Sequence, residues 1–174
     1  MKILFISDIH GVITNLNVIR NHKFDKLVLL GDLYSSDVHN GMNNDNNEVD
    51  RLINEYNDKI LCVKGNCDYL ADYQRLEVAV SNDYLKITDE GLDIYCTHGD
   101  GYNYHKLSFL GTGGVIIYGH EHCPYIEKVN DVVYICVGSI SKPRYGSKAS
   151  YCIYENKEFI IYSVDGEIID FINI

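Results

Sequence analysis

The sequence predicts an α/β domain in which two mixed β-sheets pack together and are flanked by helices. Two observations lead to this expectation. In the first third of the chain, short apolar segments alternate with segments of helical periodicity, which is typical of βαβ units and a parallel sheet. The rest of the chain is a series of short strand-like segments separated by turn residues, as in antiparallel meanders. No linker, low-complexity segment or repeat divides the sequence, so we expect residues 1–174 to form a single domain.

The first third contains the predicted parallel strands. The patterns predict a strand at 1–7, a helix at 12–21, a strand at 26–30, a helix at 48–56 and a strand at 59–64. Residues 34–47 are polar and rich in asparagine, and we expect a long surface loop there. In parallel sheets, ligands bind beyond the carboxyl ends of the strands, and Asp8, Asp32 and Asn66 each follow a predicted strand.

The remainder is predicted to be mostly β-structure. Residues 89–91, Asp-Glu-Gly, lie between two strand-like segments and predict a hairpin. The expected strands are 84–88, 92–97, 115–118, 125–129, 132–137, 150–154, 159–164 and 167–172, with a short helix at 103–110.

Composition restricts the class of protein. The 15 basic and 25 acidic residues give a net charge of −10, and an acidic surface repels nucleic acid, so we expect no stable nucleic-acid complex. No two of the six cysteines form a CxxC pair and we see no signal peptide, so we expect reduced thiols and a cytoplasmic location. No apolar run reaches the ~20 residues of a membrane helix. The cysteines in apolar runs, expected to be buried, are Cys62, Cys96, Cys136 and Cys152.

Five segments place a metal-ligand type of side chain beside a glycine or at a predicted strand end. They are Asp8-Ile9-His10-Gly11, Gly31-Asp32, Gly65-Asn66-Cys67-Asp68, Thr97-His98-Gly99 and Gly119-His120-Glu121-His122. Each one alone is a weak indication, because a strand-end aspartate is more often a turn residue and a lone histidine more often a structural one. In an extended segment, side chains two residues apart share one face, which strengthens the Asp-x-His and His-x-His pairs.

In this order, the five segments resemble the motifs of the calcineurin-like metallophosphoesterase superfamily, and more closely those of its small bacterial phosphodiesterase branch. The motifs extend from residue 8 to residue 122, and the chain is similar in length to that branch. Residues 138–141, Gly-Ser-Ile-Ser, also resemble a serine-containing loop of the branch. The resemblance implies a four-layer sandwich, with two mixed β-sheets flanked by helices, and a binuclear metal centre.

The resemblance also implies which residues bind the two divalent ions. The first ion would be bound by Asp8, His10, Asp32 and His122. The second would be bound by Asp32, Asn66, His98 and His120, so that Asp32 bridges the two. Oxygen and nitrogen ligands without thiolate suit Mn²⁺, which we expect, with Fe²⁺, Zn²⁺, Ni²⁺ and Mg²⁺ as alternatives. Asp68 and Asp100 could accept hydrogen bonds from ligand histidines or, slightly favoured, could be solvated turn residues.

The implied activity is hydrolysis of a small phosphodiester by a metal-bridging hydroxide. Two divalent ions, two aspartates and one hydroxide leave a charge of roughly +1, which suits a phosphodiester monoanion. The implied catalytic residues are Asp32, Asn66, Cys67 and His98. Many superfamily members have histidine where this chain has Cys67. A neutral thiol is a weak donor, so we expect aryl diesters to react faster than alkyl phosphates, although a packing role for Cys67 is as plausible.

Other functions remain open. A phosphomonoesterase could use the same ligands, and a non-catalytic protein-interaction scaffold could have the same fold. The complete set of seven ligands disfavours the scaffold. A nucleotide-binding protein is disfavoured because the chain lacks GxGxxG and GxxxxGK[ST] loops. The family resemblance suggests a homodimer, and we expect no membrane partner.

Two further sets of residues are secondary candidates. Tyr102, Tyr104 and His105 could border the site and select substrate, although ordinary surface or core filling is the more common role of such residues. Lys142 and Arg144 could bind the substrate phosphate, although exposed loop charge is the more common explanation.

Overall fold

The computed structural model describes residues 1–34, 46–69, 71–104 and 113–174. Its strands are β1 (Lys2–Ile6), β2 (Lys26–Leu29), β3 (Ile60–Val63), β4 (Val80–Ser81), β5 (Tyr84–Asp89), β6 (Leu92–Thr97), β7 (Gly114–Tyr118), β8 (Tyr125–Val129), β9 (Val132–Cys136), β10 (Ser150–Glu155), β11 (Glu158–Ser163) and β12 (Ile168–Asn173). Its helices are α1 (Asn17–Asn21), α2 (Asn46–Asn54) and the 3₁₀ helix η1 (Asp72–Arg75). None of these helices is both long and apolar enough to cross a membrane.

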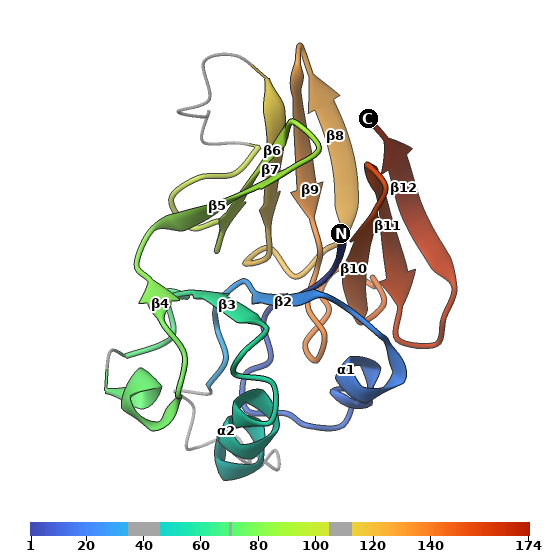
Figure 1. Ribbon diagram of the computed structural model, residues 1–174. Helices are drawn as coiled ribbons and strands as arrows, with labels where there is room; N and C mark the ends of the chain where they lie inside the picture. Colours follow the sequence, from blue (N-terminus) through green and yellow to red (C-terminus); the bar gives the residue numbers. More distant parts are fainter. Residues whose placement is uncertain (35–45, 70, 105–112) are drawn as a thin grey trace.

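The strands form two mixed sheets that pack against each other (Figure 1). The larger sheet has the order β12-β11-β10-β1-β2-β3-β4, with β1 to β4 parallel and β10 antiparallel to β1. The smaller sheet has the order β5-β6-β7-β9-β8. The prediction of two packed mixed sheets is confirmed. The prediction of antiparallel meanders is confirmed for β8 with β9 and for β10 to β12. It is wrong for β7, which pairs in parallel with both β6 and β9 because long connections allow a crossover.

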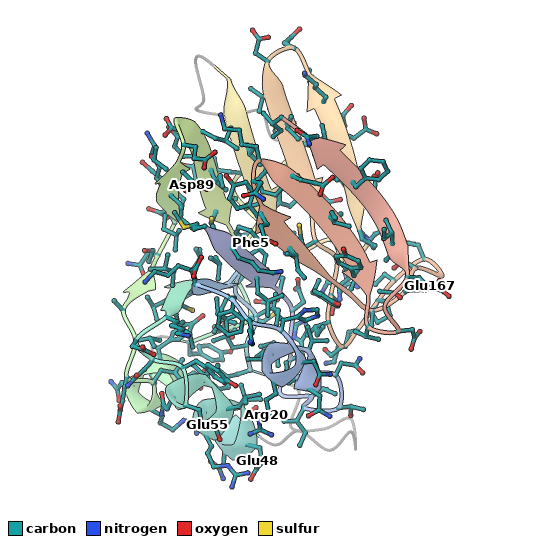
Figure 2. The ribbon with its side chains drawn as sticks, turned by 45° about the vertical axis from the view of Figure 1, so that its right-hand side comes forward. Phe5, Arg20, Glu48, Glu55, Asp89 and Glu167 are labelled. Atoms are coloured by element: carbon teal, nitrogen blue, oxygen red, sulfur yellow. The ribbon has the colours of Figure 1, made fainter. Side chains whose placement is uncertain are left out.

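Two apolar cores explain why the first strands are apolar along their whole length. On β1, Phe5 packs between the sheets in a cluster with Ile117 (Figure 2). Its neighbour Leu4 points to the opposite face and packs with Ile19 of α1 and Ile53 of α2. Because both faces of β1 are buried, its sequence has no polar alternation.

The helix expected at 12–21 is confirmed only over α1. Residues 12–14 are Val-Ile-Thr, and three successive β-branched side chains disfavour a helix. The Asn15 side chain instead donates a hydrogen bond to the Ile140 carbonyl at 2.7 Å. This contact ties the start of α1 to the loop after β9.

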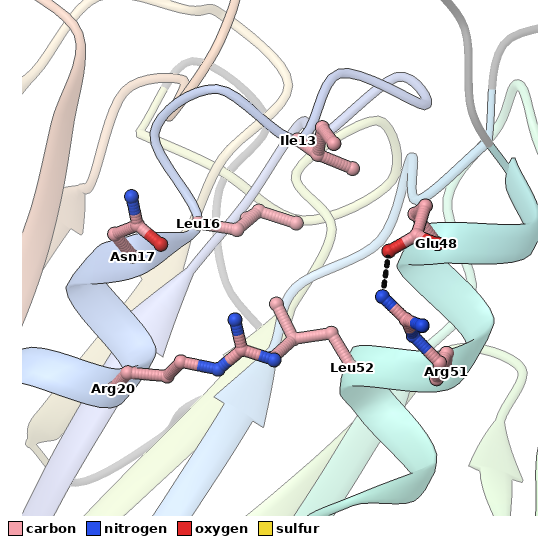
Figure 3. Close-up of a pocket in the computed structure, with 7 residues that line it drawn as sticks. All are labelled: Ile13, Leu16, Asn17, Arg20, Glu48, Arg51 and Leu52. Atoms are coloured by element: carbon pink, nitrogen blue, oxygen red, sulfur yellow. Dashed lines mark hydrogen bonds and ion pairs between the residues drawn. The ribbon is translucent and has the colours of Figure 1, made fainter.

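Helices α1 and α2 lie side by side on the outer face of the larger sheet (Figures 1 and 3). A hollow of about 80 Å³ separates them at the surface. Its two arginines are already paired, Arg20 with Glu55 and Arg51 with Glu48. We therefore assign the hollow no role.

Some expected elements fall outside the described part of the chain. The loop expected at 34–47 and the helix expected at 103–110 lie mostly at residues 35–45 and 105–112, so both stay predictions. A helical layer over the smaller sheet depends on the second of them. The sequence did not predict β4 or η1, which are only 2 and 4 residues long.

Candidate metal centre

All seven sequence-predicted ligands meet where parallel strands of both sheets end. The loops after β1, β2 and β3 carry Asp8, His10, Asp32 and Asn66, and those after β6 and β7 carry His98, His120 and His122. Backbone hydrogen bonds continue the strand pairing into these loops. His10 N donates to the Asp32 carbonyl at 2.9 Å, and Gly119 N donates to the His98 carbonyl at 2.9 Å.

Five of the seven ligands have a left-handed backbone. The φ angles are 56° at Asp8, 50° at His10, 52° at Asp32, 63° at His120 and 61° at His122. Such a backbone costs a non-glycine residue roughly 1–3 kcal/mol and persists where the surroundings hold it. The expectation that the paired ligands share one face of an extended segment is therefore wrong, because left-handed turns bring them together instead.

Two motif glycines are sterically required by the close approach of the loops. A Cβ on Gly65 would lie 2.1 Å from both the backbone N and Oδ1 of Asp32. A Cβ on Gly119 would lie 1.8 Å from Ser7 Oγ and 2.4 Å from Asp8 Oδ2. The glycines before Asn66 and His120 thus allow ligands from different strands to reach one site.

Four atoms form what we call the first ligand group: Asp8 Oδ1, His10 Nε2, Asp32 Oδ2 and His122 Nε2. His122 Nε2 lies 3.1 Å from Asp8 Oδ1 and 3.3 Å from His10 Nε2. His10 Nε2 lies 3.7 Å from Asp8 Oδ1 and 3.8 Å from Asp32 Oδ2. These spacings fit atoms that bind a common ion at roughly 2.0–2.2 Å each.

The second ligand group consists of Asp32 Oδ1, Asn66 Oδ1, His98 Nε2 and His120 Nδ1. His98 Nε2 lies 2.9 Å from Asn66 Oδ1, 3.3 Å from His120 Nδ1 and 3.5 Å from Asp32 Oδ1. The two carboxylate oxygens of Asp32 therefore face different ligand groups.

The first ligand group leaves one buried oxygen that suits a cation. Asp8 Oδ1 is buried, and no described residue donates a hydrogen bond to it. The other oxygen, Oδ2, accepts one from His120 N at 2.9 Å. An unpaired buried carboxylate oxygen is costly, and a bound divalent ion would remove that cost. The residues present therefore fit a divalent metal ion.

The charges of the site point the same way. Burial alone would raise the pKa of Asp32, but its hydrogen bond with His98 and the charge of that ring hold it well below its ordinary value. Burial alone would lower the pKa of His98, but the hydrogen bond to Asp32 and the charges of Asp8 and Asp32 raise it to about 9. Metal binding requires a neutral imidazole, so an ion would take the place of this proton.

Residues 1–158 match the family model described as the calcineurin-like phosphoesterase superfamily domain. The chain belongs to this superfamily.

Individual relatives agree with this assignment. The chain is 28% identical over 173 residues to phosphodiesterase YfcE of Escherichia coli K12, covering 96% of this chain and 94% of YfcE. The YfcE structure, of a phosphoesterase from E. coli, matches with a TM-score of 0.91 and covers 99% of this chain and 98% of that one. Zinc-complexed Vps29 from Entamoeba histolytica shares the fold, with 17% identity, a TM-score of 0.62 and coverage of 99% and 98%.

Backbone carbonyls orient two of the predicted ligand histidines. His98 Nδ1 donates to the Leu30 carbonyl at 2.8 Å, and His122 Nδ1 donates to the Lys142 carbonyl at 2.5 Å. Each ring therefore presents Nε2 to the site, as expected for ligand histidines with a fixed tautomer.

Asp68 does not act as either sequence-based interpretation expected. It is only 3% exposed, so it is no solvated turn residue. It accepts hydrogen bonds from Tyr34 N, Gly65 N and Tyr73 Oη at 3.1, 3.1 and 2.5 Å, rather than from a ligand histidine. It therefore joins the loop after β2 to the loop after β3. Asp100 is exposed, and its charge acts on His120.

Cys67 lies beside the Asp32 carboxylate. Its backbone N donates to Asp32 Oδ1 at 2.8 Å, and its Sγ lies within 4.8 Å of ligand atoms of His10 and Asp32. Burial and the negative charge of Asp32 raise the pKa of Cys67 to about 12. In the metal-free protein the thiol is therefore neutral near pH 7. The four cysteines that the sequence predicts to be buried are buried: Cys62, Cys96, Cys136 and Cys152.

The secondary candidates differ in position. Burial lowers the pKa of His10, and the charge of half-buried Lys142 adds a smaller effect in the same direction, whereas Arg144 is exposed. Tyr102 lines a hollow of about 110 Å³ between the loops of Asn66 and His98. Tyr104 packs edge-on against Tyr134 on the smaller sheet, as its core-filling interpretation predicts. His105 lies outside the described residues.

Sequence reasoning gave no role to two serines that contact the site. Ser139 and Ser141 lie after β9, and their hydroxyls hydrogen-bond to the Asp8 carbonyl at 2.8 and 2.9 Å. The only signal in the sequence was the resemblance of residues 138–141 to a family loop.

Proposed function

We propose that this protein is a binuclear metal-dependent phosphodiesterase. The observation that carries the proposal is the position of Asp32, with Oδ2 3.8 Å from His10 Nε2 and Oδ1 3.5 Å from His98 Nε2. One carboxylate could then bridge two ions held by the two ligand groups. The similarity to YfcE over 96% of the chain supports this activity. We propose Mn²⁺ as the ion, with Fe²⁺, Zn²⁺, Ni²⁺ and Mg²⁺ as alternatives.

Two bound ions would supply a hydroxide from a shared water and neutralise charge on the phosphate oxygens. The residues of the chain would set the geometry. Asp32 would hold both ions, and the carbonyl-anchored rings of His98 and His122 would keep their positions. Asn66 is exposed, with Oδ1 facing His98; its Nδ2 donates one hydrogen bond to Cys67 Sγ at 3.3 Å, which leaves its second N–H to donate to a phosphate oxygen.

Cys67 favours diesters with good leaving groups in this proposal. A neutral thiol supplies neither positive charge for a monoester dianion nor an efficient proton for a poor leaving group. Aryl diesters need the least protonation when the alcohol leaves. The hollow beside Tyr102 is also lined by Gly65 and Thr97, the sequence neighbours of Asn66 and His98, and could receive part of the organic group.

The test is an assay of metal-stripped protein on bis(p-nitrophenyl) phosphate with Mn²⁺, Mg²⁺, Zn²⁺ or no metal. We expect hydrolysis that a metal restores, that Asp32→Ala abolishes, and that Asp165→Ala retains because Asp165 is exposed in the β11–β12 turn. Faster hydrolysis of p-nitrophenyl phosphate would instead favour the phosphomonoesterase. Binding of two ions without hydrolysis of either compound would favour the scaffold.

The six cysteines are free, which supports the cytoplasm as the proposed location, because thiols stay reduced there. A homodimer, the lack of a membrane partner and the lack of a stable nucleic-acid complex stay predictions.

A further inference from the structure

The loop at residues 138–142 contains no proposed ligand, yet it contacts both segments that carry the ligands unique to the first ligand group. It follows β9, whose parallel pairing with β7 ends beside the site. Ile140 N continues the contact by donating to the Ser7 carbonyl at 3.1 Å. The loop therefore lies directly against the segment that carries Asp8 and His10.

Two serine hydroxyls of this loop hold backbone carbonyls of that segment. Ser139 Oγ donates to the Asp8 carbonyl at 2.8 Å, while Ser141 Oγ lies 2.9 Å from the Asp8 carbonyl and 2.8 Å from the Ile9 carbonyl. Ser139 Oγ also accepts from the backbone N–H groups of Ser141 and Lys142 at 3.2 and 2.8 Å. With one donated and two accepted bonds, the buried Ser139 hydroxyl has no remaining capacity.

The two held carbonyls belong to the two peptide units between Asp8 and His10. Both of these ligands have the left-handed backbone, with φ of 56° and 50°. Such a conformation persists only where the surroundings hold it. Fixing both peptide planes fixes the backbone torsions between the ligands, and therefore the directions of their side chains.

The same loop orients the third ligand unique to this group. The Lys142 carbonyl accepts from His122 Nδ1 at 2.5 Å, which leaves Nε2 at 3.1 Å from Asp8 Oδ1. The second ligand group has a different support, since His98 Nδ1 donates to the Leu30 carbonyl after β2. The contacts of the 138–142 loop thus favour one ligand group over the other.

We propose that Ser139 and Ser141 are positioning residues that preorganise the first ligand group for its ion, a role that rests on the proposed binuclear site. They touch neither substrate nor ion. They act through the backbone of Asp8 and Ile9, and their loss lets these peptide units relax from the strained conformation. In the described part of the chain, neither serine hydrogen-bonds to a residue unique to the second ligand group, so that group serves as the internal reference.

The experiment is calorimetric titration of the metal-free protein with Mn²⁺, in wild type, Ser139→Ala, Ser141→Ala and Ser141→Thr. His122→Ala identifies the binding phase that belongs to the first ligand group. We expect Ser141→Ala to weaken that phase about 10- to 100-fold, the usual effect of removing a hydrogen-bond partner behind a metal ligand. The Mn²⁺ affinity of the other phase should stay within about twofold of wild type. Ser141→Thr, which keeps the hydroxyl, should retain most of the wild-type affinity in the first phase.

Ser163→Ala is the matched control for Ser139→Ala. Ser163 is as buried as Ser139 but lies at the end of β11, where its hydroxyl accepts a hydrogen bond from Glu167 N. If either serine variant weakens both phases equally, or no more than Ser163→Ala does, the positioning role is wrong. Ser141 is half-buried, so its variant tests the proposal even where Ser139→Ala does not fold. Two-phase binding without diester hydrolysis in the wild type contradicts the phosphodiesterase and leaves the serine result standing.

Discussion

The two ligand groups share Asp32 but differ in how far solvent reaches them. In the first, Asp8, His10 and His122 are 0%, 8% and 2% exposed. In the second, Asn66 is exposed and His120 half-buried, and only His98 is buried. In the proposed site, a substrate would therefore approach from the second ligand group, while an ion bound by the first would be shielded from water.

The groups also differ in how the backbone presents them. All three residues unique to the first group have a left-handed backbone. Of the three residues unique to the second group, only His120 does. The strained conformations are therefore concentrated where burial and hydrogen bonds can hold them. A rigid, buried set of ligands loses little freedom when an ion binds, so we expect the first group to bind its ion more tightly.

The largest effect should come from the matched pair His122→Ala and His120→Ala. Each removes one imidazole ligand from the same turn, but from different groups. In a Mn²⁺ titration, His122→Ala should lose the tight phase and His120→Ala the weak one. Each affinity loss should exceed the roughly 10- to 100-fold effect of losing a partner behind a ligand.

Chelator competition on the loaded wild-type protein would sharpen this comparison. One ion should leave early and one late, and His120→Ala should retain only the late one. If both variants lost the same phase, the division into a tight buried group and a weak open group would be wrong.

A smaller effect, on the rate of hydrolysis, is expected from Cys67→His, beside the more exposed second ligand group. An imidazole can supply the proton or charge that a thiol with a pKa near 12 cannot. We expect hydrolysis of alkyl diesters to rise by about tenfold, which is below the usual range of roughly 100- to 10,000-fold for general-acid catalysis, with little change for bis(p-nitrophenyl) phosphate. Cys67→Ser is the control for size. If Cys67→His hydrolysed every substrate at the wild-type rate, Cys67 would only pack beside the site.

The sequence predicted which side chains come together at the site because side-chain type and strand-end position are local properties. Asp8, Asp32 and Asn66 follow apolar runs whose strand character is clear, since both faces of those strands are buried. It could not predict the left-handed backbone at Asp8 or His10, because no glycine marks these positions.

The supports of the site were harder to predict because they depend on distant parts of the chain. Ser139 meets the Asp8 carbonyl across 131 residues of sequence, and Lys142 meets His122 through its backbone, where side-chain identity carries no signal. Asp68 has a pKa raised by burial and contacts Tyr34, 34 residues away. Its sequence context, a polar Gly-Asn-Cys-Asp turn, indicated the opposite exposure.

The smallest effect on activity, but a clear one on stability, is expected from Tyr73→Phe. The Tyr73 hydroxyl donates a hydrogen bond to Asp68 Oδ2 at 2.5 Å. The same carboxylate accepts a hydrogen bond from Gly65 N and so stabilises the loop that carries Asn66. Loss of a hydrogen bond to a buried charge should lower the free energy of unfolding by about 1.5–3 kcal/mol in urea denaturation. Tyr69→Phe is the control, because Tyr69 lies in the same loop and is 67% exposed.

Tyr73→Phe also separates the two ligand groups. Because Asn66 belongs only to the second, the weak Mn²⁺ phase should decline by a few-fold while the tight phase keeps its affinity. An unchanged free energy of unfolding would mean that Asp68 does not depend on Tyr73 for its position. A loss of affinity in the tight phase would mean that the loop after β3 supports both ligand groups. The idea that the first ligand group is supported independently would then be wrong.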